Sequence, residues 1–498
     1  KQNNRQNAHQ EIDHIFKELL PARGMAERPV QVALSHKMLD AMLDDSIALC
    51  DAGTGIGKTY AYLVAGIVFS RSRAARGLAN QPVLISTSSI ALQNAVLEEY
   101  LPFLSSVLIE DRMTKTPIRA VLRKGKSHYV CDERLKQRLQ AVDLTRKSPR
   151  ARDALLSLRD HLDLDMAEHL SGYDRARVGV PKVCDCGRES CRYQCFMEVC
   201  ASNWYQVQIC NHNLLLADAI HRNLGRRPLL PEWSTLILDE AHKLPEAARQ
   251  MFGITLTAAE IHELIRVLRR ERYLLASENL EEAAGPVLRE LARPWDEDGT
   301  FSHFAPFLNR PNHTLELIQK QIGTILPHRT QRQLDQLRDK TALFLQKQRD
   351  MIFYTAEDSH GGTMLCATTP NLTDQLRQTL WRQQKPMILT SGTLAVGEDF
   401  RRFKEATGLL TDSRVRESVS LSPFAYSRNC LMYVSRLPAH QGAGQYYDSL
   451  TAEIAALLDA AHGHALVLFT SYAAMSAVKE RLREQDLAYQ LFTLGPVS

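Results

Sequence analysis

Residues 52–59 read Ala-Gly-Thr-Gly-Ile-Gly-Lys-Thr, and residues 235–242 read Thr-Leu-Ile-Leu-Asp-Glu-Ala-His. The first stretch has the spacing of a phosphate-binding loop, in which glycines let main-chain N–H groups close around phosphates. In such a loop Lys58 would reach the β- and γ-phosphates, and the Thr59 hydroxyl would bind Mg²⁺. The second stretch is an apolar strand that ends in two carboxylates. Together they predict a site for a nucleoside triphosphate.

The two carboxylates suit the chemistry of hydrolysis. Asp239 would hold Mg²⁺ at the carboxyl end of its strand, and Glu240 would orient and deprotonate the attacking water. The apolar run 47–50 suits a buried strand before the loop, and residues 60–70 suit an amphipathic helix after it. The simpler alternatives are an ordinary glycine-rich turn and a chance helix start. The predicted nucleotide-binding residues of the loop are Ala52, Gly53, Thr54, Gly55, Ile56, Gly57, Lys58 and Thr59.

Length and composition allow several domains and place few limits on partners. The chain has 498 residues, with 61 basic and 57 acidic side chains. This near-neutral balance is compatible with a basic groove for nucleic acid but does not by itself indicate one. No apolar stretch is as long as the ~18 residues of a transmembrane helix, and the amino terminus resembles no signal peptide. We therefore expect a cytoplasmic protein without membrane contact.

Ten cysteines in a cytoplasmic chain favour metal binding or simple burial over disulfides. Four of them are scattered in apolar surroundings, and the other six, Cys131 and those at 184, 186, 191, 195 and 200, are candidates for a metal centre. Thiolates at such short spacing can converge on four-coordinate zinc or on an iron–sulfur cluster. Their spacing alone leaves both metals open.

Other segments are less specific. Residues 83–87 form an apolar strand ending in Ser86 and Thr87, whose hydroxyls could touch a phosphate backbone, although residues 86–89 would also serve as a helix cap. Residues 255–350 are mostly helical by period, most clearly at 260–275 and 331–348. A basic face in this region consists of Arg266, Arg269, Arg270 and Arg272. The two interpretations of this face are a solvated helix surface and a DNA contact. Two further strands are predicted at 387–394 and 465–472.

The order of these segments resembles the DinG and XPD branch of superfamily 2 DNA helicases, across nearly the whole chain. The resemblance also runs through Ser391-Gly392-Thr393-Leu394, Ser422-Pro423-Phe424 and Phe469-Thr470-Ser471. It is closer to DinG, because of Tyr129-Val130-Cys131 and Asn211-His212. The resemblance implies an α/β fold, with two RecA-like P-loop domains, a Cys-rich iron–sulfur insertion and a helical arch insertion.

The implied domains are a first motor domain in three pieces, two insertions and a second motor domain. The first motor domain would occupy 1–120, 206–254 and 361–395. The iron–sulfur insertion would occupy 121–205, the helical arch 255–360, and the second motor domain 396–498.

The resemblance also assigns residues. It implies a [4Fe–4S] cluster with Cys131, Cys186, Cys191 and Cys195 as ligands, and Cys184 and Cys200 as alternates. Arg28 and Gln31 match an element that contacts adenine in the family. His242 would couple the state of the nucleotide to the strand ending at 391–393. His212 lies where the family has a residue near the DNA path, and a core or helix-capping histidine is the equal alternative.

The function implied is an ATP-dependent helicase in DNA repair or replication, moving 5′ to 3′ on single-stranded DNA with ATP, Mg²⁺ and the cluster. Forked duplex DNA is the expected substrate, RNA–DNA hybrids stay open, and a monomer is expected. Two alternatives are a non-catalytic or redox-sensing DNA-binding module, and another P-loop ATPase with a zinc-stabilised insertion.

The chain departs from the family at its end. The Gly-x-Asp and Gln-x-x-Gly-Arg segments expected after 469–471 are not in the 498 residues. An arginine of that kind can contribute about 10³ to 10⁵ in rate, so the chain is expected to bind ATP and hydrolyse it poorly, as a fragment of a longer helicase. Only a short segment precedes Arg28, so no exonuclease domain is expected there.

Overall fold

The computed structural model describes all residues except 1, 146–148, 182–190, 296–299, 347–350, 359–360, 438–442, 486–488 and 494–498. The chain divides into two compact units, Lys1–Pro423 and Phe424–Ser498. The domain boundary predicted after residue 395 lies before this division, and the assignment of the segments to motor and insertion domains stays a prediction.

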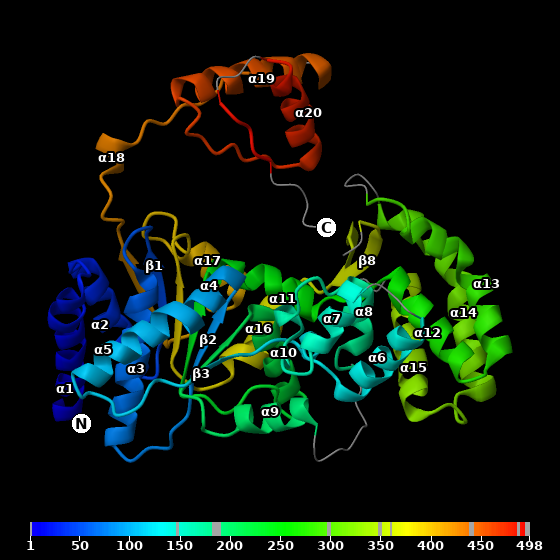
Figure 1. Cartoon of the computed structure of the whole chain (residues 1–498), viewed down its shortest axis with the longest axis horizontal. Coiled ribbons are helices and arrows are strands. Elements are labelled where there is room, and N and C mark those ends of the chain that lie inside the picture. Colours follow the sequence, from blue (N-terminus) through cyan, green and yellow to red (C-terminus); the bar gives the residue numbers. More distant parts are fainter. Residues whose placement is uncertain are drawn as a thin grey trace. The chain divides into compact units, whose positions relative to one another are not determined.

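The larger unit contains a seven-stranded sheet, in the order β10-β1-β9-β5-β2-β4-β3 (Figure 1). Its strands are β1 Ile47–Ala52, β2 Val83–Thr87, β3 Ala120–Leu122, β4 Val207–Cys210, β5 Thr235–Asp239, β9 Met387–Ser391 and β10 Val415–Ser420. Every pairing in this sheet is parallel. The carboxyl ends of all its strands therefore meet at one edge, which is where open α/β sheets bind ligands.

Alternation along the strands explains why both faces of the sheet are covered. In β1, Ala48 and Cys50 face one apolar core, and Ile47 and Leu49 face the other. Successive side chains of a strand point to opposite faces, so such a continuous apolar run suits a strand covered on both sides. Helices α1, α2, α3 and α5 build the first core, and α10, α11, α16 and α17 build the second.

The helices that accompany this sheet lie on both faces. They are α1 Gln2–His14, α2 Pro29–Leu43, α3 Lys58–Ala75, α4 Ile90–Ala95, α5 Leu101–Glu110, α10 His212–Asn223, α11 Leu244–Phe252, α16 Leu372–Leu376 and α17 Arg401–Thr407. None of the helices in the described part of the chain is long and apolar enough to cross a membrane.

The described residues between β3 and β4 include four α-helices, in the segment for which the sequence predicts the Cys-rich insertion. They are α6 Asp132–Thr145, α7 Pro149–Ser157, α8 Gly172–Val178 and α9 Arg192–Ala201. An apolar core of their own includes Val130, Leu135, Leu155 and Val178. This core lets the segment fold as a separate layer beside the sheet.

A second helical part follows β6, Ile254–Leu256. It contains α12 Ala258–Arg270, α13 Leu274–Leu291, α14 Ala305–Ile322 and α15 His328–Gln346, packed around a third core. Strands β7 Ile352–Glu357 and β8 Thr363–Thr368 close it in an antiparallel sheet of order β6-β8-β7. The helix predicted over 260–275 is interrupted, because Arg272 adopts a positive φ of 67° between α12 and α13.

The smaller unit contains α18 Tyr426–Asn429, α19 Ala443–Ala460 and α20 Tyr472–Arg483. The strand predicted over 465–472 is wrong for this structure, since residues 464–469 carry no strand and α20 begins at Tyr472. A strand requires hydrogen bonds to a neighbouring strand, and the described residues of this unit contain none. Leu466 and Leu468 are accordingly exposed at 82% and 83%.

Candidate functional site

The phosphate loop joins the carboxyl end of β1 to the first turn of α3. Gly55 and Gly57 adopt positive φ angles of 85° and 87°, a conformation that side chains rarely tolerate. Gly57 is the N-cap of α3, and Lys58 is the first residue of that helix. A loop of this shape at a helix N-terminus presents main-chain N–H groups to an anion. Of the other loop residues, Ala52 and Ile56 are buried.

Arg28 and Gln31, at the start of α2, form hydrogen bonds to the main chain of this loop. The Arg28 guanidinium donates to the Gly55 carbonyl at 2.8 Å, and the Gln31 amide donates to the Gly57 carbonyl at 2.7 Å. In this ligand-free chain both residues therefore fix the loop's main chain. Their predicted contact with adenine stays a prediction.

The carboxyl end of β5 places Asp239 and Glu240 beside the loop. Burial raises the pKa of Asp239 to about 6, because its carboxylate is only 1% exposed. The Glu240 carboxylate lies 3.9 Å from the Lys58 ammonium. Glu240 also has a positive φ of 52°, a strained conformation for a residue with a side chain. These groups form an anion site flanked by two carboxylates.

Strand β9 lies between β1 and β5 and brings a third element to the same edge. The Ser391 hydroxyl lies 2.7 Å from His242 Nδ1 and donates to Glu240 at 3.4 Å. A Cβ added to Gly392 would lie 3.8 Å from Lys58 Nζ. The predicted residues Lys58, Glu240 and His242 are thus brought together around Ser391.

Sequence reasoning missed two residues at this edge. The Asp51 carboxylate accepts hydrogen bonds from the N–H groups of Leu394 and Ala395 at 2.7 and 2.8 Å, which ties the turn after β9 to β1. A charged residue inside an otherwise apolar strand was the available signal.

Tyr62 is the second residue, and it is fully buried. Burial raises the pKa of its phenol well above the usual value, and Asp239 acts in the same direction. Thr59, in the first turn of α3, also acts on this phenol.

The hydroxyls at the end of β2 do not face solvent. Ser86 and Thr87 are both fully buried, so a direct contact with a phosphate backbone is not available to them in this structure. Ser89 accepts from the Leu92 N–H and caps α4, and the Gln93 amide donates to the Thr87 carbonyl at 2.9 Å. The capping alternative accounts for this segment.

The predicted cluster ligands fall partly outside the described residues. Cys186 and its alternate Cys184 lie there, whereas Cys131 precedes α6 and Cys191 is the N-cap of α9. Arg192 donates to Asp132 at 2.8 Å, so the residues next to these two cysteines are joined. Cys195 follows one turn later in α9, with its N–H bonded to the Cys191 carbonyl at 3.0 Å.

The described cysteines alone do not complete a metal site. Within the described ranges no three His, Cys, Asp or Glu side chains are grouped closely enough to hold a metal ion. Cys200 is fully buried at the far end of α9, and burial raises the pKa of its thiol to about 11.

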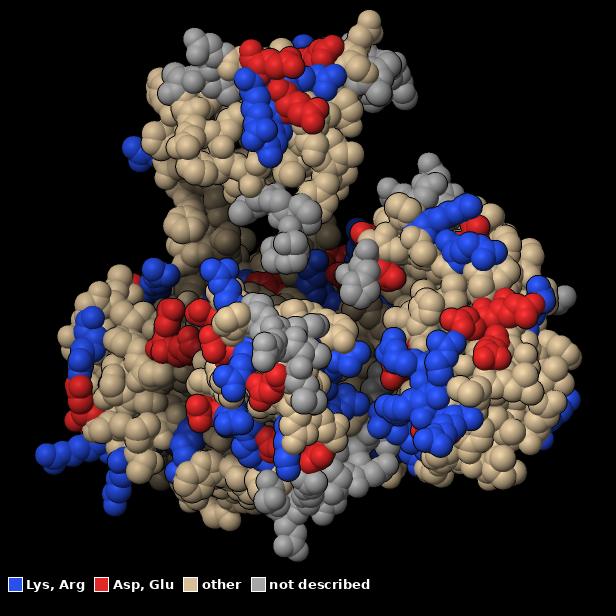
Figure 2. All heavy atoms as spheres, turned by 45° about the vertical axis from the view of Figure 1, so that its right-hand side comes forward, with Lys and Arg blue, Asp and Glu red and all other residues tan. Residues whose placement is uncertain are grey.

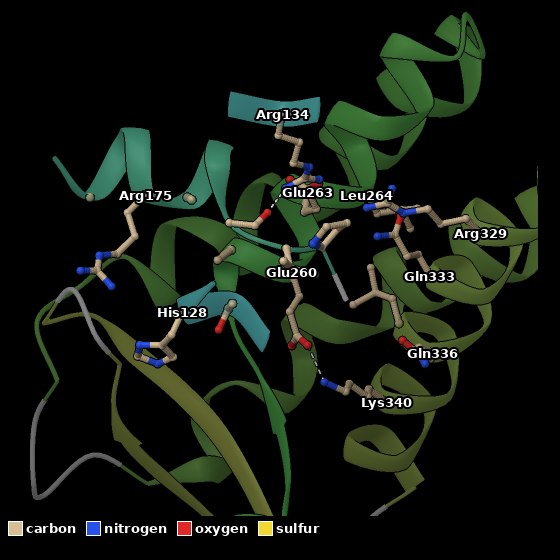
Figure 3. A pocket seen from close by; sticks show the side chains of 18 residues that line it. His128, Arg134, Arg175, Glu260, Glu263, Leu264, Arg329, Gln333, Gln336 and Lys340 are labelled. Carbon is tan, nitrogen blue, oxygen red and sulfur yellow. Dashed lines mark hydrogen bonds and ion pairs between the residues drawn. The ribbon is translucent and has the colours of Figure 1, made fainter. Parts of the chain in front are cut away.

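A cavity of about 590 Å³ lies between α6 and α8 on one side and α12 and α15 on the other (Figure 3). Its charged lining consists of Arg134, Arg175, Arg329, Lys340, Glu260 and Glu263. Lys340 pairs with Glu260 at 2.6 Å, whereas no carboxylate among the described residues pairs with Arg134 or Arg329. Partial burial and repulsion from Arg329 lower the pKa of Arg134. Arg134 and Arg329 lie close enough to repel each other, and Glu263 offsets this charge in part, so the cavity suits a polyanionic ligand that contacts the two arginines.

The basic face predicted on α12 is divided. Arg266 pairs with Glu263, and Arg269 pairs with Glu281 at 2.6 Å. Arg270 is the member whose charge acts on Arg134 at the cavity. Figure 2 shows Lys and Arg side chains gathered on the side of the helical part that borders the rest of the larger unit.

No protein-family model matches the chain. The ATP-dependent DNA helicase YoaA of Escherichia coli (strain K12) is 27% identical over 493 residues, which cover 92% of this chain and 74% of the relative. The ATP-dependent helicase DinG of Mycobacterium tuberculosis (strain ATCC 25177 / H37Ra) is 26% identical over 514 residues, covering 93% and 74%. A solved structure named XPD_APO covers 90% of this chain at 13% identity, with a TM-score of 0.40. This TM-score is too low to support a shared fold, so the fold class is assigned from the parallel sheet alone.

Proposed function

We propose, from the homology of this chain to the DinG and YoaA helicases and from the geometry of its nucleotide site, that it is an ATP-dependent DNA helicase. One observation carries the proposal. The phosphate loop, the end of β9 and the carboxylates after β5 lie on neighbouring strands, with the Lys58 ammonium 3.9 Å from Glu240. That arrangement suits a motor that hydrolyses ATP, and the relatives suggest DNA as its track.

In the proposed mechanism the chain's own residues position the triphosphate. The loop's N–H groups and Lys58 hold the phosphates, while Thr59 and Asp239 would hold Mg²⁺. The buried Asp239, with a pKa of about 6, fits a divalent cation, because a cation would compensate a carboxylate that burial disfavours. When bound, Mg²⁺ neutralises charge on the phosphates. Glu240 orients and deprotonates the attacking water.

His242 links this chemistry to the rest of the motor. Its Nδ1 shares the Ser391 hydroxyl with Glu240, at 2.7 and 3.4 Å. A change in the position of Glu240 on hydrolysis would therefore alter the hydrogen bonds of Ser391 at the end of β9. We assign to His242 the role of passing the nucleotide state to that strand.

Single-stranded DNA is the proposed ligand of the cavity between α6, α8, α12 and α15. Arg134 and Arg329 would contact phosphates, so binding should be salt-dependent. Movement from 5′ to 3′, forked duplex substrates, a repair role and a monomeric state belong to the proposal through the family resemblance.

A [4Fe–4S] cluster on Cys131, Cys186, Cys191 and Cys195 is part of the same proposal. Cys131 and Cys191 stand at the amino ends of α6 and α9, where the helix dipoles favour the negative charge of thiolate ligands. The ion pair of Asp132 with Arg192 holds these two ends together. The donors fit a cluster, whose chemistry would be electron transfer or structural support.

The helicase assignment is tested by ATP-driven displacement of a labelled strand from forked DNA, together with phosphate release stimulated by single-stranded DNA. Glu240→Gln should lower turnover by about 100-fold or more, because it removes the general base, and should preserve ATPγS binding. Glu98→Gln, at an exposed carboxylate of the same unit, is the matched control. Wild-type turnover in the Glu240 variant, or no response to DNA in the wild type, contradicts the proposal. Duplexes tailed at the 5′ or the 3′ end distinguish the direction of movement.

The DNA path is tested by fluorescence anisotropy with labelled oligothymidylate at several salt concentrations. Arg134→Ala and Arg329→Ala should each weaken binding and reduce the salt slope by about 1. Arg269→Ala, on α12 but paired with Glu281 outside the cavity lining, should change neither value. Equal losses in all three variants would place the path elsewhere.

The cluster is tested by the colour and metal content of protein purified without oxygen. We expect a yellow-brown protein with iron and acid-labile sulfide, whose visible absorbance bleaches on reduction. Cys195→Ser should lose the colour, and Cys200→Ser should keep it, because the Cys200 thiol is fully buried away from the amino end of α9. A colourless protein with stoichiometric zinc would support the zinc-stabilised ATPase instead.

A further inference from the structure

His212 is a buried residue that links two strands of the sheet. It is the first residue of α10 and only 2% exposed. Its Nδ1 lies 2.7 Å from the Ser86 hydroxyl at the end of β2. Burial lowers the pKa of His212 to about 4, so the ring is neutral near pH 7 and acts through hydrogen bonds, not charge.

The other side of the ring faces the catalytic strand. The main-chain groups of Glu240 and Asp239 approach the imidazole as hydrogen-bond partners and favour its charged form, against the effect of burial. Its Nε2 is buried, and none of its contacts with the described residues has the full geometry of a hydrogen bond. A small shift of β5 would therefore change how closely the main chain of Asp239 and Glu240 approaches the ring.

The same ring borders a cavity of about 330 Å³ at the carboxyl edge of the sheet. Its lining includes Ser88, Asn211, Asn213, Lys243, Glu246 and Gln250. Asn211 caps α10 through a hydrogen bond from the Leu214 N–H at 2.8 Å. Asn211 and Asn213 are the chain neighbours of His212, so a strand of nucleic acid at this cavity would contact residues that are bonded to it.

Glu240 is the group that such a shift would move. Its main chain is held at a positive φ of 52°, and its carbonyl accepts from the Lys243 N–H at 2.9 Å. Strain of this kind makes a conformation sensitive to its neighbours. The Glu240 carboxylate in turn lies beside Lys58 and Ser391.

We propose that His212 is a positioning residue that couples nucleic acid at the ends of β2 and β4 to the position of Glu240 in the nucleotide site. The proposal rests on the helicase function proposed above. It requires no contact between His212 and DNA, because Ser86 and the main chain of β5 are its neighbours.

Coupling between two sites is measured as a ratio of affinities. Calorimetry gives the Kd of ATPγS with Mg²⁺ in the absence and presence of saturating oligothymidylate. The wild-type ratio should be about fivefold or more, the lower end of usual coupling. In His212→Phe the ratio should fall to about one, while the Kd for either ligand alone changes by less than about twofold.

A matched control lies on the same helix. His221 lies in the last turn of α10 and bonds the Arg227 carbonyl at 3.0 Å, so His221→Phe should keep the wild-type ratio. If His212→Phe does not fold, His212→Asn serves, since an amide can keep the bond to Ser86 and lacks a group at the Nε2 position. It should lose the ratio as well.

The outcomes separate the two proposals. A wild type that does not bind oligothymidylate overturns the helicase function and this inference with it. A wild type that binds it, and a His212 variant that keeps the full ratio, overturn only the positioning role. A His212 variant that loses affinity for oligothymidylate alone shows direct DNA contact, and also overturns the positioning role.

Discussion

The substitution Gly57→Ala tests the contact between the phosphate loop and α2. Gly57 has a φ of 87°, and a Cβ there would lie well inside van der Waals contact distance of Gln31 Nε2 and 3.0 Å from Gln31 Cδ. The left-handed conformation costs a residue with a side chain about 1–2 kcal/mol. Displacing Gln31 also breaks its 2.7 Å bond to the Gly57 carbonyl and leaves a buried amide unpaired, which costs about 1–3 kcal/mol. The expected loss of unfolding free energy is about 2–5 kcal/mol.

Gly77→Ala is the matched control for this prediction. Gly77 has a φ of 72° and nothing within 4 Å of an added Cβ, so it meets only the conformational cost. Urea unfolding followed by circular dichroism should show Gly57→Ala as the more destabilised variant by about 1–3 kcal/mol. In a Gln31→Ala background this excess should disappear, because the clash and the hydrogen bond are both gone. Equal losses in the two glycine variants would refute the close approach of Gln31.

Three further predictions concern the same edge of the sheet. Asp51→Ala leaves the N–H groups of Leu394 and Ala395 without their acceptor, and should lower the unfolding free energy by about 2–4 kcal/mol in urea titrations. Asp51→Asn keeps an acceptor oxygen without the charge, so its loss of unfolding free energy should be smaller. Asp239 has a folded-state pKa of about 6 against an ordinary 3.8, so the folded chain binds the proton more tightly and its stability falls as pH rises through that window. Asp239→Asn should therefore be the more stable protein above pH 6, by about 3 kcal/mol, with the difference vanishing below pH 3.8; a constant difference would refute the burial argument. Lys58→Ala should abolish ATP turnover and weaken ATPγS at least about tenfold in calorimetry, with oligothymidylate affinity unchanged, and normal turnover would refute the assignment.

The parts of the site that could be predicted from sequence are those encoded locally. The glycine spacing at 52–59 determines a turn with positive φ angles, and the apolar run 235–238 before Asp239 determines a buried strand with a carboxylate at its end. Both patterns depend only on residues close together in the sequence, so they can be predicted without knowledge of the fold. The same reasoning identifies β9, although not its place between β1 and β5.

Other features came only from packing between distant segments. The neighbouring order of β1, β9 and β5 brings Ser391 to Glu240, and the packing of α2 under the loop gives Gln31 its contact with Gly57. The strand predicted over 465–472 failed for the same reason in reverse, since an apolar segment becomes a strand only when a neighbour supplies its hydrogen bonds. The sequence by itself determined which residues can bind phosphate and carry a carboxylate at a strand end. Only the tertiary structure decided which of them meet, because strand order and helix packing depend on contacts between residues tens to hundreds of positions apart.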